Sequence, residues 1–394
     1  MTSLTSAWVR LHAVSRAIAP PDDLLEHLGP NGQAWLRDGT GFVTSGVAAR
    51  IDVEWAEAAL ADIEIDDPLR WPGTGPLAIG ALPFDPAGRG SLIIPSTVIG
   101  RTNDGRGWIT EIDAPTTPED ARRALEEPTR WQVTSPVDRE RWRAMVRGAL
   151  GAIGRGELVK VVLARPVVID ADAPFSAQRT LRNLARSEPG CFVHHADGVI
   201  GASPELLVRR IGTDLESRPL AGTAPAAEGA AVRLQASEKD AREHELVIDG
   251  VRAALAPLCH RLDVPDSPVP VSFSSVVHLA TPIRGELRPP PPSALTLARR
   301  LHPTAAVAGT PCDEALRAIA ALEPAPRGRY AGPIGWVDAR GDGEWAVALR
   351  GAELDGARAV LRAGAGIVDG SDPDAEWAET QAKLEPMLRA LVTP

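Results

Sequence analysis

The sequence predicts an α+β protein in which antiparallel strands predominate. Two observations favour this class. Apolar runs of strand length, cut by Gly and Pro, fill the first 130 residues and return in 330–373, where Asp-Gly and Gly-rich turns join them. Helical apolar spacing begins after residue 135, where capping signals precede it. A chain of 394 residues is expected to form two or three domains, or one large mixed domain.

The first expected elements are strands. Apolar runs that predict short strands lie at 41–55, 75–85 and 90–101. Ser135 and Asp138 form a capping-box signature, which predicts a helix of about four turns after them. A β-branched run at 158–170 then predicts a buried strand.

The second half of the chain adds further strands and two long helices. Ser237 and Asp240 form a second capping box, which predicts a helix of about five turns. The four prolines at 289–292 predict a stiff connector before a short helix. The other expected elements are a strand–turn–strand unit at 198–210, a strand with a Gly-rich loop at 215–230, a strand at 271–287 and a closing helix at 374–388.

Composition and charge exclude several classes of protein. The chain has 42 basic and 52 acidic residues, a formal charge of −10 and no basic block, so a groove that binds nucleic acid is hard to build and no nucleic-acid partner is expected. No run of 18 apolar residues occurs, so no membrane span is expected. The N-terminus lacks the apolar core of a secretory signal, which predicts a cytoplasmic protein. Cys191, Cys259 and Cys312 lack the spacing of a zinc site or a disulfide framework.

Lysine is rare in this chain. Of the 42 basic residues, only Lys160, Lys239 and Lys383 are lysines, and all of the others are arginines. Biased nucleotide composition would explain the preference for arginine. A desolvated lysine, however, can lose its proton near neutral pH, whereas arginine stays charged. A site that needs an amine base therefore requires lysine, which makes these three residues candidates for such a site.

Two predicted helices carry acidic pairs at three-residue spacing. Asp240 stands with Glu243, and Glu376 with Glu379, so each pair projects from one helical face. Such a face is often simply exposed to solvent. If the two faces converge, they offer oxygen ligands only, without Cys or paired His. This donor set suits Mg²⁺, with waters and a substrate carboxylate completing its coordination.

Lys160 and Glu205 suggest acid–base chemistry. Lys160 lies in the strand predicted at 158–170, where its side chain either extends to solvent or points into a polar cavity. Glu205 follows Ser-Pro at a turn and either caps a helix or is buried, which would raise its pKa. A neutral lysine and a protonated glutamate could remove a proton at one position and protonate a leaving group at another.

Other residues indicate anion binding rather than nucleotide binding. Arg350, at the end of an alternating strand, is suited to bind a carboxylate, although a structural ion pair would give the same pattern. His278 is either a core histidine or a pocket residue. The glycines from Gly364 to Gly370 lack dinucleotide-fingerprint spacing, and no phosphate loop or α/β-hydrolase elbow occurs. The Rossmann, P-loop NTPase and α/β-hydrolase interpretations are therefore excluded.

Nine ordered segments, over about residues 135–390, resemble the chorismate-utilising enzymes: KVVLARPV, GASPELLVRR, RPLAGTAP, SEKDAREHELV, HLATPIRG, LHPTAAVAGTP, RYAGPIGWVD, VALRGAEL and GAGIVDGSDPDAEWAETQAKLEPML. The resemblance implies antiparallel β-sheets packed as a sandwich with flanking helices. It implies one domain, with 1–130 as its N-terminal strand-rich part and 131–394 as the chorismate-binding catalytic region. It also implies a Mg²⁺-dependent active site between sheet and helices.

The resemblance assigns roles motif by motif. Lys160 matches the base that activates water, and Glu205 the acid that protonates the departing 4-hydroxyl of chorismate. Four acidic residues match metal ligands or their neighbours: Glu243, Glu379, Glu376 and Asp240. The matched substrate contacts are Gly222, Thr223, His278, Tyr330, Arg350, Gly364, Gly366 and Lys383.

Within this family, the chain resembles the isochorismate synthases most. Anthranilate synthases carry an amide where Lys160 stands, and aminodeoxychorismate synthases carry a lysine where Ala221 stands, so both alternatives weaken. Salicylate synthases share both features, so a further elimination of pyruvate stays open. A non-catalytic paralogue would be expected to lack one of the key acid, base or metal residues. We expect chorismate as substrate, Mg²⁺ as cofactor, a monomer, and no obligatory amidotransferase subunit.

Overall fold

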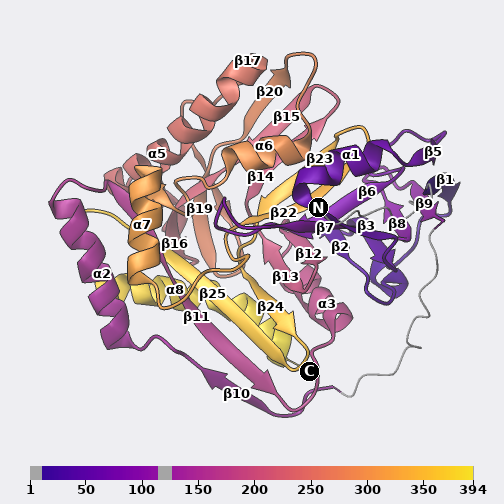
Figure 1. Cartoon of the computed structure of the whole chain (residues 1–394). Coiled ribbons are helices and arrows are strands. Elements are labelled where there is room, and N and C mark those ends of the chain that lie inside the picture. The colour runs from indigo at the N-terminus through magenta and orange to yellow at the C-terminus, as the bar shows by residue number, and fades with distance from the viewer. Residues whose placement is uncertain (1–10, 114–126, 394) are drawn as a thin grey trace, which may run out of the picture.

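Antiparallel strands dominate the computed structural model, which describes residues 11–113 and 127–393 (Figure 1). They form two large sheets and one small sheet, with helices around them. All paired strands are antiparallel except β1 and β5, which run parallel. The N-terminal part expected at 1–130 includes residues 1–10 and 114–126, which lie outside the described residues, as does Pro394.

Both large sheets combine strands from before and after residue 130. The first sheet has the strand order β10 (Trp131–Thr134), β11 (Lys160–Ala171), β25 (Arg358–Ile367), β24 (Gly351–Asp355), β13 (Val199–Ser203), β12 (Phe192–Ala196), β2 (Ala34–Arg37), β3 (Thr40–Ser45), β8 (Thr97–Arg101), β9 (Gly107–Ile112), β1 (His12–Ile18) and β5 (Glu64–Asp66), and β21 (Gly309–Thr310) pairs with β11. The second sheet has the order β17 (Cys259–Asp263), β20 (Ile283–Leu287), β15 (Asp214–Arg218), β14 (Leu206–Ile211), β23 (Gly343–Val347), β22 (Pro333–Asp338), β6 (Leu77–Ala81), β7 (Ser91–Ile94) and β4 (Ala49–Asp52).

The small third sheet and the helices complete the fold. The third sheet has the order β16 (Leu220–Pro225), β19 (Val276–Ala280) and β18 (Val269–Ser272). The helices are α1 (Ala56–Ala61), α2 (Arg139–Gly154), α3 (Ala177–Ser187), α4 (Ala230–Gln235), α5 (Glu238–Leu255), α6 (Ala294–Leu301), α7 (Cys312–Leu322) and α8 (Pro373–Val392). No helix in the parts of the chain that the structure describes is both long and apolar enough to cross a membrane.

The two large sheets pack face to face, which confirms the predicted sandwich. Trp35 and Phe42 of the first sheet share one apolar cluster with Ile79 and Trp336 of the second, and each side chain is at most 5% exposed. Phe42 meets the edge of Trp336 with ring centroids 5.7 Å apart. Burial of this aromatic and aliphatic surface holds the sheets together.

Helices flank the sandwich, as the resemblance implied. Leu181 of α3 and Leu384 and Leu391 of α8 are buried against Leu361 of β25, on the outer side of the first sheet. Helices α2, α5, α6 and α7 bury side chains in another cluster, which includes residues of β11 and of the second sheet. The apolar stripe of α8 therefore fixes one face of this helix and leaves another face free for a site.

The structure corrects some expected boundaries. The N-cap of α2 is Asp138, which accepts from the N–H of Arg141, so Ser135 does not cap this helix. At α5, Ser237 is the N-cap, as predicted. The single strand expected at 271–287 is instead divided among β18, β19 and β20, because the chain turns twice and enters two sheets. The expected Gly-rich loop begins as strand β16.

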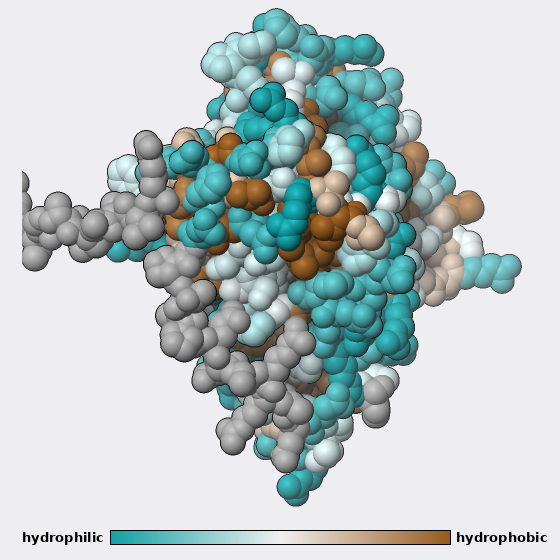
Figure 2. All heavy atoms as spheres, turned by 90° about the vertical axis from the view of Figure 1, so that its right-hand side faces the viewer, coloured by the Kyte–Doolittle hydropathy of each residue, from teal (hydrophilic) through white to brown (hydrophobic). Residues whose placement is uncertain are grey.

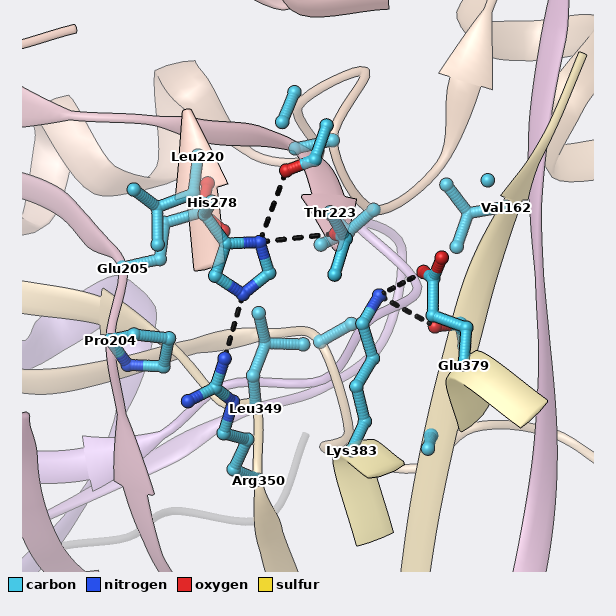
Figure 3. Close-up of a pocket in the computed structure, with 18 of the residues that line it drawn as sticks. Val162, Pro204, Glu205, Leu220, Thr223, His278, Leu349, Arg350, Glu379 and Lys383 are labelled. Carbon is cyan, nitrogen blue, oxygen red and sulfur yellow. Dashed lines mark hydrogen bonds and ion pairs between the residues drawn. The ribbon is translucent and has the colours of Figure 1, made fainter. Parts of the chain in front are cut away.

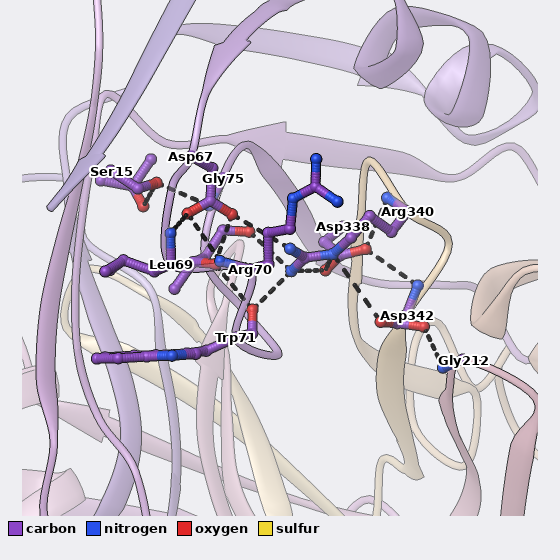
Figure 4. A network of polar contacts seen from close by, with 12 residues as sticks. Ser15, Asp67, Leu69, Arg70, Trp71, Gly75, Gly212, Asp338, Arg340 and Asp342 are labelled. Carbon is purple, nitrogen blue, oxygen red and sulfur yellow. Dashed lines mark hydrogen bonds and ion pairs between the residues drawn. The ribbon is translucent and has the colours of Figure 1, made fainter. Parts of the chain in front are cut away.

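A polar network ties the N-terminal half to the β22–β23 turn (Figure 4). Arg340 contacts Asp67 at 3.2 Å and Asp338 at 2.7 Å through its two terminal nitrogens. Asp342 accepts a hydrogen bond from the N–H of Gly212 at 2.7 Å. One arginine thus joins segments that are far apart in the sequence.

The face of the N-terminal strands is largely hydrophilic, with smaller apolar clusters near its centre (Figure 2).

Candidate active site

A polar cavity of about 200 Å³ opens between the third sheet, β25 and the helices α5 and α8. Nearly all of the candidate site residues line it. These are Glu205, Gly222, Thr223, Asp240, Glu243, His278, Tyr330, Arg350, Gly364, Gly366, Glu376, Glu379 and Lys383. In the view of Figure 3, His278 and Arg350 lie between Glu205 on one side and the Lys383–Glu379 pair on the other. The fold thus brings together side chains separated by almost 180 positions in the sequence.

Lys160 is not one of the residues that line the cavity, but it contacts one of them, Glu243. It begins β11, is 1% exposed, and its Nζ lies 2.8 Å from Glu243 Oε1. The lysine therefore points toward the cavity and away from solvent, which decides between the two orientations expected for it. The ammonium form of lysine has no acceptor, so Lys160 can act as a base only in its neutral form.

The acidic faces of α5 and α8 converge, as the spacing predicted, and each of three carboxylates has a lysine partner. Besides the Lys160–Glu243 pair, Lys383 Nζ lies 2.6 Å from Glu379 Oε1. Lys239 Nζ lies 3.7 Å from Glu376 Oε1. The solvated-face alternative is therefore wrong for these residues.

The pairs shift the pKa values of their members. Burial alone would raise the pKa of Glu243, but Lys160, together with the charges of Lys383 and Lys239, outweighs burial and lowers this pKa. Burial opposes the charge of Lys383, but Glu379 outweighs burial and raises the pKa of the lysine. Glu376 behaves differently, because burial and then the negative charge of Glu379 raise its pKa to about 7.

Glu205 lies between β13 and β14 and does not cap a helix. Its side chain is buried at 3% exposure, and burial raises its pKa to about 7. A hydrogen bond from the N–H of Leu220, together with the charge of Lys160, opposes this rise only in part. Glu205 can therefore carry a proton at neutral pH, which suits a general acid.

Arg350 and His278 form a second, cationic side of the cavity. Arg350 Nη2 donates to His278 Nε2 at 2.7 Å, and since a guanidinium cannot accept, the imidazole hydrogen sits on Nδ1. This Nδ1 faces Thr223 Oγ1 at 3.1 Å and the carbonyl oxygen of Gly222 at 3.3 Å. Burial, followed by the charge of Arg350, lowers the pKa of His278 well below its usual value. The histidine is thus neutral and orients the arginine.

Arg350 retains one free donor. Its Nη1 is buried and has no hydrogen-bond partner among the described residues. The residue lies between β23 and β24 with φ of 50°, a left-handed conformation that is rare for arginine. Arg350 lines the cavity, and since burying an unpaired charged donor is costly, its guanidinium is suited to an anionic ligand that enters.

Glycines leave space where side chains would block the site. Gly222 has φ of 76° at a bulge between β16 and β19, and a Cβ there would lie 3.1 Å from Asp240 Cβ. A Cβ on Gly366 would lie 2.8 Å from Glu243 Oε1, and one on Gly364 would lie 3.2 Å from the Tyr330 hydroxyl. Only glycine keeps both strands close to the cavity.

The donor set fits a divalent cation. Asp240, Glu243, Glu376 and Glu379 supply carboxylate oxygens only, which suits Mg²⁺. Burial, and then the charge of Glu379, raises the pKa of Glu376, so a bound cation would favour its ionised form. Within residues 11–113 and 127–393, however, no three potential ligand side chains stand close enough together to hold a metal ion. The carboxylates must turn from their lysine partners to bind one.

Some residues that line the cavity carry no signal in the sequence. Lys239 was a candidate only through the rarity of lysine, without an assigned role, and it lines the cavity. Pro204, Val307 and Leu349 supply apolar surface. Nothing in the local sequence distinguishes these three from ordinary core residues, because only the tertiary fold brings them to the cavity.

Comparisons with known proteins agree with this arrangement. A sequence model for a family described as chorismate binding enzyme matches residues 106–392. Isochorismate synthase DhbC of Bacillus subtilis is 37% identical over 333 residues, which cover 80% of this chain and 81% of the relative. Isochorismate synthase EntC of Escherichia coli is 36% identical over 390 residues, covering 92% and 95%. The solved structure of MenF, the menaquinone-specific isochorismate synthase of Escherichia coli, aligns with a TM-score of 0.81 at 27% identity, covering 97% of this chain and 94% of that chain.

Proposed function

Because the chain belongs to the family of chorismate-binding enzymes, we propose that it is an isochorismate synthase, which converts chorismate to isochorismate. The observation that carries this proposal is the placement of a buried lysine and a protonatable buried glutamate at one cavity. Lys160 is 1% exposed, and the pKa of Glu205 is raised by burial to about 7. Such a pair can activate water and protonate a leaving hydroxyl in the same turnover.

The reaction exchanges one C–O bond for another. Lys160 takes a proton from water as the water oxygen bonds to C2 of the ring. The ring double bonds shift, the C4–O bond breaks, and Glu205 gives its proton to the departing hydroxyl, which leaves as water. Lys160 ends protonated and Glu205 ionised, so return of one proton restores the enzyme, and the product is an isomer of the substrate.

Cationic side chains hold the substrate in place. Chorismate is a dianion, and the free Nη1 of Arg350 provides a buried donor for one carboxylate. Tyr330, Thr223 and His278 form the neighbouring wall. Glu243 and Glu379, with Asp240 and Glu376 beside them, would hold Mg²⁺, which when bound supplies positive charge for the other carboxylate.

A second candidate function is salicylate synthesis, in which isochorismate loses its enolpyruvyl group as pyruvate. Lys160 and the segment around Ala221 are compatible with it. Ala221 lacks the amine that the aminodeoxychorismate branch uses, and Lys160 stands where anthranilate synthases carry an amide, so both amine-forming branches are disfavoured. We propose that the chain acts as a cytoplasmic monomer without an amidotransferase subunit.

Product analysis tests the proposed function. Purified protein is incubated with chorismate and Mg²⁺, and the products are separated by chromatography, with pyruvate measured by lactate dehydrogenase. We expect a mixture of chorismate and isochorismate without pyruvate, because the two isomers contain nearly the same bonds. Complete conversion to salicylate with stoichiometric pyruvate would support the second candidate. Ammonium-dependent anthranilate would refute the assignment.

A further inference from the structure

All three lysines of the chain meet at one cavity, and each pairs with a different carboxylate there. Lys160 pairs with Glu243, Lys383 with Glu379, and Lys239 with Glu376. Arginine occupies all of the other positions among the 42 basic residues of this chain. Lysine carries a compact charge on a flexible stem, so it can leave a carboxylate more easily than a forked guanidinium can.

The three pairs differ in how firmly they are held. Lys160 is 1% exposed and lies 2.8 Å from its partner. Lys383 is 21% exposed, lies 2.6 Å from Glu379 and also donates to the carbonyl oxygen of Gly364. Lys239 is 48% exposed, and its 3.7 Å contact to Glu376 is the longest of the three. The Lys239 pair is therefore the weakest, since water competes with it and screens it.

Lys239 competes with a divalent cation for the side chain of Glu376. Its Nζ lies 3.7 Å from Oε1, and its positive charge repels an ion that approaches the same carboxylate. Lys239 lies in the first turn of α5, one residue before Asp240, where it can swing into solvent. Lys160 is fully enclosed and lacks this freedom.

We propose that Lys239 is the exchangeable counter-cation of the metal site: it holds Glu376 while no divalent ion is bound and must release it when the ion enters. This inference rests on the Mg²⁺ site of the proposed function. It assigns Lys239 a positioning role, in which the lysine sets the metal affinity through Glu376 without touching the reacting atoms.

Amine labelling measures this release directly. The parent protein is treated with an acetylating N-hydroxysuccinimide ester, with Mg²⁺ or with NaCl of equal ionic strength, and the three lysines are followed by peptide mass spectrometry. An added lysine peptide serves as the internal reference. We expect Lys239 to be labelled first and Mg²⁺ to raise its rate about threefold, which is the scale of an exposed ion pair that opens. Labelling of Lys239 that Mg²⁺ slows or leaves unchanged would overturn the inference.

Direct binding gives a second readout that needs no turnover. Mg²⁺ alone is titrated by calorimetry at pH 8.5 into the parent, K239Q, K239R and the control R242Q. Arg242 lies on the same helix, is 80% exposed and pairs only with the exposed Glu238. We expect K239Q to bind Mg²⁺ about tenfold more tightly than the parent, or about 1.4 kcal/mol, because the competing charge is gone. K239R and R242Q should stay within about twofold of the parent.

The outcomes separate this inference from the proposed function. If K239Q binds Mg²⁺ no more tightly than R242Q while the parent makes isochorismate with Mg²⁺, the inference is wrong and the proposed function stands. If the parent binds no Mg²⁺ and makes isochorismate without it, the inference and the proposed cofactor both fail. If no isochorismate forms under any condition, the proposed function fails, whatever the labelling shows.

Discussion

Replacing Glu205 with glutamine tests whether one buried carboxyl group supplies the proton for the departing hydroxyl. Burial raises the pKa of Glu205 from its ordinary 4.5 to about 7. At pH 7 about half of the molecules then carry the proton, compared with roughly one in 300 for an ordinary glutamic acid. The rise corresponds to about 3 kcal/mol of preference for the neutral form.

The sign of the pH dependence follows from this pKa. Glu205 must be protonated to act, so its ionisation should lower turnover above pH 7, by up to about tenfold for each pH unit. Lys160 must be neutral to act as the base, and this requirement works in the opposite direction. Turnover is measured as the initial rate of isochorismate formation at saturating chorismate from about pH 5.5 to 9. Glu205→Gln should lower this rate by roughly 10²-fold or more and remove the alkaline limb.

A matched control is Glu286→Gln, which removes an exposed carboxyl from β20, away from the cavity, and should leave rate and pH profile unchanged. A parent pH profile with the same shape as that of the Glu205→Gln variant would contradict the acid role. So would a Glu205→Gln variant that retains most of the parent turnover.

Three further changes test other parts of the structure. Lys160→Arg keeps a positive charge beside Glu243 but cannot act as an amine base, so turnover should fall by roughly 10²-fold with an unchanged melting curve; near-parent turnover would refute the base role. Arg350→Gln should raise KM for chorismate by about 30-fold and kcat/KM should fall in parallel, whereas an unchanged KM would remove this residue from the substrate site. Arg340→Ala leaves two buried carboxylates without their partner and should lower the free energy of unfolding by about 3 kcal/mol at pH 8 in urea titrations. Burial raises the pKa of Asp338 to about 6, so folding favours its protonated form, and the loss should be smaller at pH 5; an equal loss at both pH values would argue against this network.

The sequence identified site residues whose spacing or residue type is unusual in this chain. Three-residue spacing on α5 and α8 predicted that each acidic pair would share a helix face, and both faces line the cavity. Lys160 stood out because lysine is rare here, and the structure buries it beside Glu243. The resemblance supplied the glycines and His278, which composition and periodicity alone would not have distinguished.

Long-range geometry explains what the sequence left open. Which lysine pairs with which carboxylate depends on how α5, α8 and β11 meet, and no local pattern encodes that. The same holds for Arg350, whose free Nη1 and contact with His278 arise from a connection between β23 and β24. The division of 271–287 into three strands likewise depends on two sheets that local propensity does not specify.

The most direct test of the central claim is the fate of the oxygen atom. The protein is incubated with chorismate and Mg²⁺ in H₂¹⁸O, and the product is isolated at low conversion and analysed by mass spectrometry. Attack of water that Lys160 activates predicts isochorismate with one ¹⁸O atom, located in the C2 hydroxyl group. Isochorismate without ¹⁸O would contradict the proposed base and acid roles, because the hydroxyl would then have moved within the substrate, and anthranilate or salicylate as the main product would contradict the assignment itself.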